Sequence, residues 1–176
     1  MNTDSWKIYA KNKVNEILDE VSGCLTLKTP IPIKAVAELY LGDVNIVTHI
    51  SDELGFPSGV SAFSTKDMNN GWIIAINGRE CVERQRFSLA HELAHIVLNL
   101  NLAKKVYCSI DSNSWDEDLC DQFAGDILMP ENMVRTMYQT NSKPFIGDVM
   151  KAFKVSRPVA EIQLKRLGLA FKLNTG

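Results

Sequence analysis

The segment from Ser88 to Ile96 constrains the fold most, because it places three ionisable side chains in an apolar background. It reads Ser-Leu-Ala-His-Glu-Leu-Ala-His-Ile, so His91 and His95 are four residues apart and fall on one face of a helix. A helix that is apolar almost all round is typical of a protein core. Ionisable groups in a core are costly unless they are paired or bound to a metal. The segment therefore predicts a buried helix with a partner for its polar side chains.

The H-E-x-x-H pattern predicts a zinc site of the zincin type. Both imidazoles can bind one Zn²⁺, and Glu92 follows the first of them closely enough to act as the general base. The alternative for a single histidine is a core residue bonded to a backbone carbonyl. Two of the three histidines lie at ligand spacing around a glutamate, which favours the metal. His49 has no nearby ligand partner, and we interpret it as a structural or surface residue.

A catalytic zinc is held by three protein ligands, and segment 115–130 is the best source of the third. Apolar residues recur there at helical spacing before a proline, and they are Leu119, Phe123, Ile127, Leu128 and Pro130. In such a helix Glu117 and Asp121 lie one turn apart on one face. This spacing suits Glu117 as a ligand and Asp121 as the acceptor of the second N–H of a ligating histidine. The alternative is a solvated acidic first turn that the helix dipole favours.

Two motifs, in this order, resemble those of the ImmA/IrrE-type metallopeptidases. The first begins at Arg84 and reads R-Q-R-F-S-L-A-H-E-L-A-H-I-V-L. The second runs from Glu117 to Pro130 as E-x-x-C-D-x-F-A-x-x-I-L-M-P, where the family has E-x-x-A-(N/D)-x-F-A-x-x-L-L-M-P. Carried over residue by residue, the resemblance implies zinc ligands at His91, His95 and Glu117, the general base at Glu92 and the histidine-orienting carboxylate at Asp121.

The sequence departs from the family pattern at two positions. Cys120 stands where the family usually has alanine. Cysteine can bind zinc, but at an alanine position we interpret it as a small packing residue. Asn99 stands where many relatives have a further histidine. This second departure removes no ligand from the expected set.

The length and composition of the chain limit the classes of protein to which it can belong. A chain of 176 residues with 45% hydrophobic residues and a net charge of −2 predicts one good core with a small appendage. No apolar run approaches membrane length, and the first residues lack the features of a signal peptide, so we expect a cytoplasmic location and no membrane partner. The four cysteines are widely spaced, which favours reduced thiols and argues against a second, structural zinc site.

The expected fold class is α+β, a minimal zincin-like metallopeptidase. Helices are expected from Asp4 or Ser5 to Gly23 and from Pro32 to Gly42. A small antiparallel sheet is expected before the metal helix, with strands at 44–47, 59–63 and 72–76. We expect Trp72–Asn77 to be the edge strand that receives a peptide substrate, and the alternative is a purely structural hairpin. The segment 101–114 has no periodic signal, and it is expected to form a rim of the cleft.

Residues 143–176 are expected to form a helical appendage on a peptidase domain of residues 1–142. Two short helices joined by a tight turn there resemble a helix-turn-helix. From Asp148 onward there are six basic residues and two acidic ones, which suggests nucleic-acid binding. The absence of an aromatic platform weakens this interpretation. A region that packs on the core or docks a protein partner is the alternative.

The resemblance implies a cytoplasmic zinc endopeptidase of narrow specificity. Relatives of this kind cleave helix-turn-helix transcriptional repressors, so the implied substrate is a DNA-binding regulator and the implied outcome is derepression of mobile-element or stress-response genes. The rival hypothesis is a regulatory or antitoxin-like DNA- or protein-binding module in which the metal is structural. The intact Glu92 argues against that rival, since structural zinc needs no carboxylate there.

Overall fold

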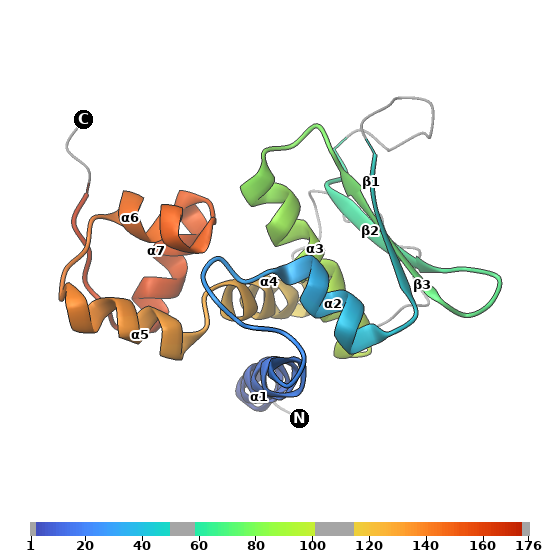
Figure 1. Cartoon of the computed structure of the whole chain (residues 1–176), viewed down its shortest axis with the longest axis horizontal. Helices are drawn as coiled ribbons and strands as arrows, with labels where there is room; N and C mark the ends of the chain where they lie inside the picture. The colour runs from blue at the N-terminus through green and yellow to red at the C-terminus, as the bar shows by residue number, and fades with distance from the viewer. Residues whose placement is uncertain (1–2, 50–58, 101–114, 174–176) are drawn as a thin grey trace.

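The computed structural model describes residues 3–49, 59–100 and 115–173, and over these ranges the protein is an α+β fold, as expected (Figure 1). Its elements are α1 (Thr3–Ser22), α2 (Ile33–Leu41), β1 (Val44–His49), β2 (Ala62–Lys66), β3 (Trp72–Asn77), α3 (Val82–Val97), α4 (Trp115–Leu128), α5 (Glu131–Thr140), α6 (Ile146–Phe153) and α7 (Arg157–Arg166). None of the described helices is long and apolar enough to cross a membrane. The expected cleft rim at 101–114 lies outside the described residues.

The two N-terminal helices follow the apolar periodicity of the sequence. In α1 the side chains of Val14, Ile17, Leu18 and Val21 are all buried, as their spacing predicts. Helix α2 ends at Leu41 because Gly42 takes a positive φ of 70°, which a residue without a side chain adopts at little cost. The Gly42 N–H then donates to the carbonyl of Glu38 and caps the helix.

The sheet is mixed, which corrects the expectation of an antiparallel one. Its strand order is β1-β3-β2, with β2 antiparallel and β1 parallel to the central β3. The short turn 67–71 joins β2 to β3 as a hairpin. Residues 50–61 separate β1 from β2, and a connection of that length lets β1 pair with the far side of β3. Trp72–Asn77 is therefore the centre of the sheet and not its edge.

The second strand also begins later than expected, at Ala62 and not at Gly59. Gly59 has a φ of 83°, outside the extended region, so the chain turns there before it can join the sheet. The shift places Ser64 in the middle of an edge strand.

Helices α3 and α4 pack against each other at the centre of the molecule, where α4 runs between the sheet side and the C-terminal helices (Figure 1). The apolar positions predicted for α4 are almost fully inaccessible to solvent, and they are Leu119, Phe123, Ile127 and Leu128. In α3 the buried set includes Leu89, Ala90, Leu93, Ala94 and Ile96. The burial of these side chains confirms the prediction of a core helix around His91.

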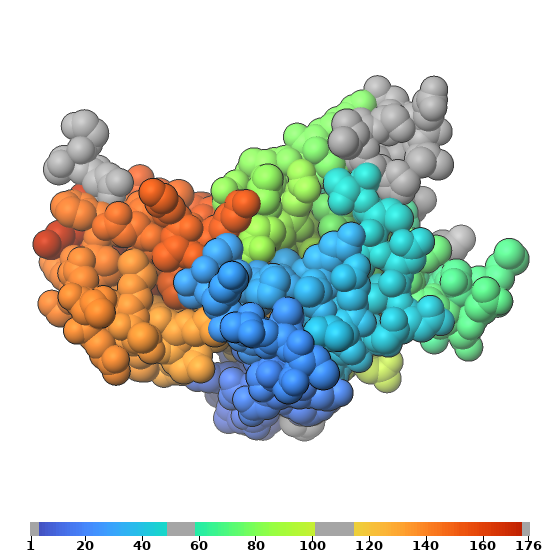
Figure 2. All heavy atoms as spheres, in the orientation of Figure 1, coloured from blue at the N-terminus to red at the C-terminus, as the bar shows by residue number. Residues whose placement is uncertain are grey.

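A buried polar network ties α7 to α4. The Gln163 amide donates to Asp126 Oδ1 at 2.8 Å, and the Arg166 guanidinium donates to Asp126 Oδ2 at 3.2 Å. Asp126 and Gln163 are 7% and 2% exposed. Figure 2 shows a notch on one face between the C-terminal helices and α3. Besides the network on α4, the bond from Arg86 to the Lys154 carbonyl joins α3 to the C-terminal helices.

Replacing Asp126 by alanine is expected to lower the free energy of unfolding by about 1–3 kcal/mol, because Gln163 and Arg166 lose their buried acceptor. Urea denaturation measures the change. The control is Glu20→Ala at an exposed position of α1, which is expected to stay within about 0.5 kcal/mol of the parent. Equal effects of the two substitutions would show that the network does not stabilise the fold.

Candidate metal centre

Helix α3 places the ionisable side chains of the H-E-x-x-H segment at the boundary of the core. The side chains of His91 and His95 are each 12% exposed, and Glu92 is 4% exposed. The two imidazoles share a face because they are one helical turn apart. Their Nε2 atoms lie 3.1 Å from each other. Two nitrogen lone pairs at this distance repel unless a proton or a cation lies between them.

Helix α4 brings Glu117 against the same two nitrogens. Its Oε2 lies 3.0 Å from His91 Nε2, and its Oε1 lies 3.6 Å from His95 Nε2. Hydrogen bonds from His91 and then His95 hold the pKa of Glu117 well below its usual range, so this carboxylate is charged at neutral pH. Nitrogen and oxygen donors of one tetrahedral zinc are about 3.3 Å apart. The three side chains fit such an ion in donor type and in spacing.

Asp121 contacts the other nitrogen of His91. Its Oδ1 lies 2.8 Å from His91 Nδ1, and its side chain is 57% exposed. A histidine whose Nδ1–H donates to a carboxylate can bind a metal through Nε2 once that nitrogen carries no proton. Asp121 therefore lies where the expected histidine-orienting carboxylate would have to lie.

Glu92 lies on α3 with its carboxylate turned toward strand β2. The Ser64 hydroxyl donates to Glu92 Oε2 at 2.7 Å. Sequence reasoning did not include Ser64 in the site, because nothing near it in the chain points to a functional role. Only the register of β2 beside β3 places this serine over α3. The bond holds the carboxylate in one orientation.

Cys120, like Ser64, has contacts at the centre that the sequence did not predict. Its side chain is fully buried on α4, and its sulfur and the ring nitrogens of His91 and His95 lie within 4.8 Å of one another. Burial raises the pKa of the Cys120 thiol, and a hydrogen bond with His95 acts in the opposite direction. Cys120 thus packs in the core, as its alanine-like position predicts, and also touches the polar cluster.

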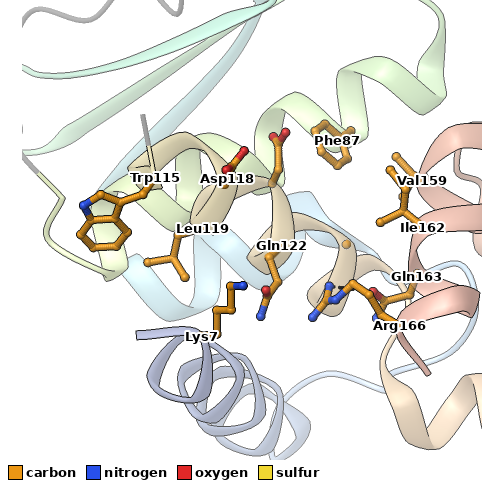
Figure 3. Close-up of a pocket in the computed structure, with 12 residues that line it drawn as sticks. Lys7, Phe87, Trp115, Asp118, Leu119, Gln122, Val159, Ile162, Gln163 and Arg166 are labelled. Carbon is orange, nitrogen blue, oxygen red and sulfur yellow. Dashed lines mark hydrogen bonds between the residues drawn. The ribbon is translucent and has the colours of Figure 1, made fainter. Parts of the chain in front are cut away.

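A hollow of about 420 Å³ extends from Asp121 along α4 toward α7. Figure 3 shows Phe87 on α3 facing Val159 and Ile162 on α7 across this hollow. Ile162 is 59% exposed. The surroundings of the histidine-orienting carboxylate are therefore open and partly apolar.

The chain is similar to known proteins in sequence and in fold. The family model described as the IrrE N-terminal-like domain, a peptidase family, matches residues 44–165. The radiation response metalloprotease IrrE of Deinococcus radiodurans is 32% identical over 97 residues, which cover 47% of this chain and 30% of that protein. The chain thus matches less than a third of the length of that relative.

A solved structure described as a Mycobacterium tuberculosis transcriptional regulator superposes with a TM-score of 0.58 and 12% sequence identity. The likeness covers 92% of this chain and 46% of that one, and it concerns the fold alone. The matched family region contains α3 and α4 with all the side chains described above. From this match we conclude that the chain belongs to the IrrE N-terminal-like peptidase family.

Proposed function

We propose that the protein is a zinc-dependent endopeptidase whose metal ligands are His91, His95 and Glu117 and whose general base is Glu92. The observation that carries the proposal is the position of Glu92. A carboxylate that is 4% exposed, oriented by Ser64 and adjacent in sequence to a paired histidine has a use in proton transfer. A purely structural zinc site has no need of it.

In this proposal the chain's own residues bind, orient and move a proton. Zinc supplies Lewis acidity, which polarises a peptide carbonyl and makes water a nucleophile near neutral pH. Glu92 takes a proton from the attacking water and delivers it to the leaving amine. Ser64 keeps the Glu92 carboxylate in place, and Asp121 keeps His91 in its ligand tautomer.

We place the substrate backbone at the outer edge of β2. This strand is an edge of the sheet, and its Ser64 bonds to the proposed base. An extended peptide that adds to such an edge satisfies its backbone hydrogen bonds and lies along the metal centre. The role expected for Trp72–Asn77 thus passes to Ala62–Lys66.

The proposed substrate is a protein, a helix-turn-helix repressor, and its cleavage in the cytoplasm would derepress mobile-element or stress-response genes. The support is the family membership and the match to a metalloprotease named for the radiation response. Narrow specificity fits a site whose carboxylate Asp121 borders a partly apolar hollow.

The C-terminal region supports a weaker second proposal, direct binding of nucleic acid or protein by residues 143–176. Helices α6 and α7 are joined by the short connection 154–156, in the manner of a helix-turn-helix. Two of its basic side chains already have acidic partners, since Arg157 pairs with Glu161 and Arg166 with Asp126. The positive charge that remains for a phosphate backbone is small, so we favour a unit that packs against a peptidase domain of residues 1–142.

Replacing His91 by alanine is expected to abolish tight zinc binding, because it removes one of the two imidazoles that hold the ion. Elemental analysis of the purified protein measures the loss from an expected one zinc per chain. The matched control is His49→Ala, which changes the third histidine and is expected to leave zinc content unchanged. Full zinc content in His91→Ala would contradict the assignment of the site.

Glu117→Ala and Asp121→Asn separate the two carboxylates of α4. Loss of Glu117 removes a ligand and is expected to weaken zinc binding strongly. Loss of the Asp121 charge is expected to weaken it only about 10- to 100-fold, as is usual for a group that orients a ligand. Competition with a chelator gives both affinities. A larger loss in Asp121→Asn would require that the two roles be exchanged.

Glu92→Gln tests catalysis apart from metal binding. Glutamine keeps the size of the side chain but cannot take a proton, so zinc content and fold should persist while cleavage falls by at least about 10²-fold. The assay co-expresses the variant with candidate helix-turn-helix repressors from the same organism and follows their length on a gel together with transcription of their targets.

The matched control is Glu83→Gln, the same change in the first turn of the same helix, which is expected to leave cleavage intact. Derepression that persists in Glu92→Gln with an intact repressor would mean that the protein acts by binding.

A further inference from the structure

Helix α4 carries three potential donor side chains on the face that it turns to α3. Glu117, Cys120 and Asp121 occupy positions i, i+3 and i+4, which are neighbours on one helical face. Glu117 and Asp121 each contact His91. Cys120, between them, is directed at the same pair of histidines. The proposed function assigns roles to the two carboxylates and leaves the sulfur without one.

The position of the sulfur is close to that of a ligand. Its distance to the ring nitrogens of His91 and His95 is at most 4.8 Å. In a tetrahedral zinc site, sulfur and nitrogen donors are about 3.5 Å apart. The difference is at most about 1.3 Å, which side-chain rotation and a small shift of the histidine rings can close. Neither movement requires α3 and α4 to separate.

The surroundings of Cys120 differ from those of the other described cysteines. Cys24 and Cys81 are exposed, whereas Cys120 is fully buried with its sulfur within 4.8 Å of ring nitrogens of His91 and His95. A cysteine that only fills an alanine-sized space has no need of a polar partner. A thiolate is also the softest donor available to the centre, and soft donors favour zinc and cobalt over magnesium and calcium.

We propose that Cys120 is a metal ligand, which with His91 and His95 forms a nitrogen–sulfur donor set for a thiophilic divalent cation such as Zn²⁺ or Co²⁺. As the bond from sulfur to the metal forms, the thiol releases its proton to solvent. This inference rests on the metal-binding part of the proposed function. Helix α4 then offers the histidine pair two alternative third donors, the carboxylate of Glu117 and the sulfur of Cys120.

With two possible donors on α4, the metal centre can be either open or closed to a further ligand. With Glu117 alone as third ligand, a position stays open for water and substrate, as catalysis requires. With Cys120 also bound, the four protein donors close the centre, as in structural zinc sites. Exchange between the two arrangements needs movement of side chains only.

Titration of the metal-free, reduced protein with Co²⁺ tests the inference without any measurement of activity. Co²⁺ in a tetrahedral protein site gives visible d–d absorption, and a cysteine ligand adds a thiolate-to-cobalt charge-transfer band in the near ultraviolet. The wild-type protein is expected to show both features with one Co²⁺ per chain. Cys120→Ala is expected to lose the charge-transfer band completely and to keep the d–d absorption.

The matched controls are Cys24→Ala, Cys81→Ala and Cys108→Ala, each of which is expected to keep the band. Wild-type protein with d–d absorption but no charge-transfer band would overturn the inference and leave the proposed function standing. A band that disappears only in one of the control variants would also overturn it. No tetrahedral d–d absorption at all would count against the metal site itself and thus against the proposed function.

The variant Glu117→Gln tests whether Cys120 can replace Glu117 as the third metal ligand. It is expected to bind Co²⁺ more weakly than the wild type but still with a charge-transfer band, because the sulfur becomes the remaining third donor. The double variant Glu117→Gln with Cys120→Ala is expected to lose tight Co²⁺ binding. If the double variant bound Co²⁺ as tightly as Glu117→Gln alone, Cys120 would contribute nothing to the donor set.

Discussion

The structure depends on the requirement that polar groups inside the α3–α4 interface find partners there. His91 and His95 lie on a helix whose other side chains build the core, and water cannot solvate them freely at 12% exposure. Helix α4 supplies these partners. Glu117 contacts Nε2 of His91, and Asp121 contacts Nδ1 of the same ring. The register of the two helices is thereby fixed by the same contacts that gather the donors of the centre.

The strand order of the sheet underlies the substrate path that we propose. Since β3 is paired on both sides, its backbone groups are occupied by β1 and β2. The outer edge of β2 is the nearer one to α3, as the bond from Ser64 to Glu92 demonstrates. In the proposed function, one strand thus both orients the base and offers its outer backbone groups to a peptide. Both properties follow from the mixed strand order.

Helix α4 links the centre to the C-terminal helices. Its first half carries Glu117, Cys120 and Asp121, and its second half carries Asp126, which binds Gln163 and Arg166 of α7. A buried network of this kind is rigid when every member is satisfied. The hollow beside Asp121 is bounded on one side by α7, so the C-terminal helices form part of the surroundings of the centre.

The sequence alone determined the helices, the α+β class and the family, because helical periodicity and the H-E-x-x-H spacing are local properties of the chain. It also named His91, Glu92, His95, Glu117 and Asp121 as a set, through two motifs that each lie on one helix. Only the tertiary structure decided the parallel pairing of β1, the edge position of β2 and the contacts of Ser64 and Cys120. These depend on strand register and helix packing between residues distant in sequence, and no local pattern records such pairings.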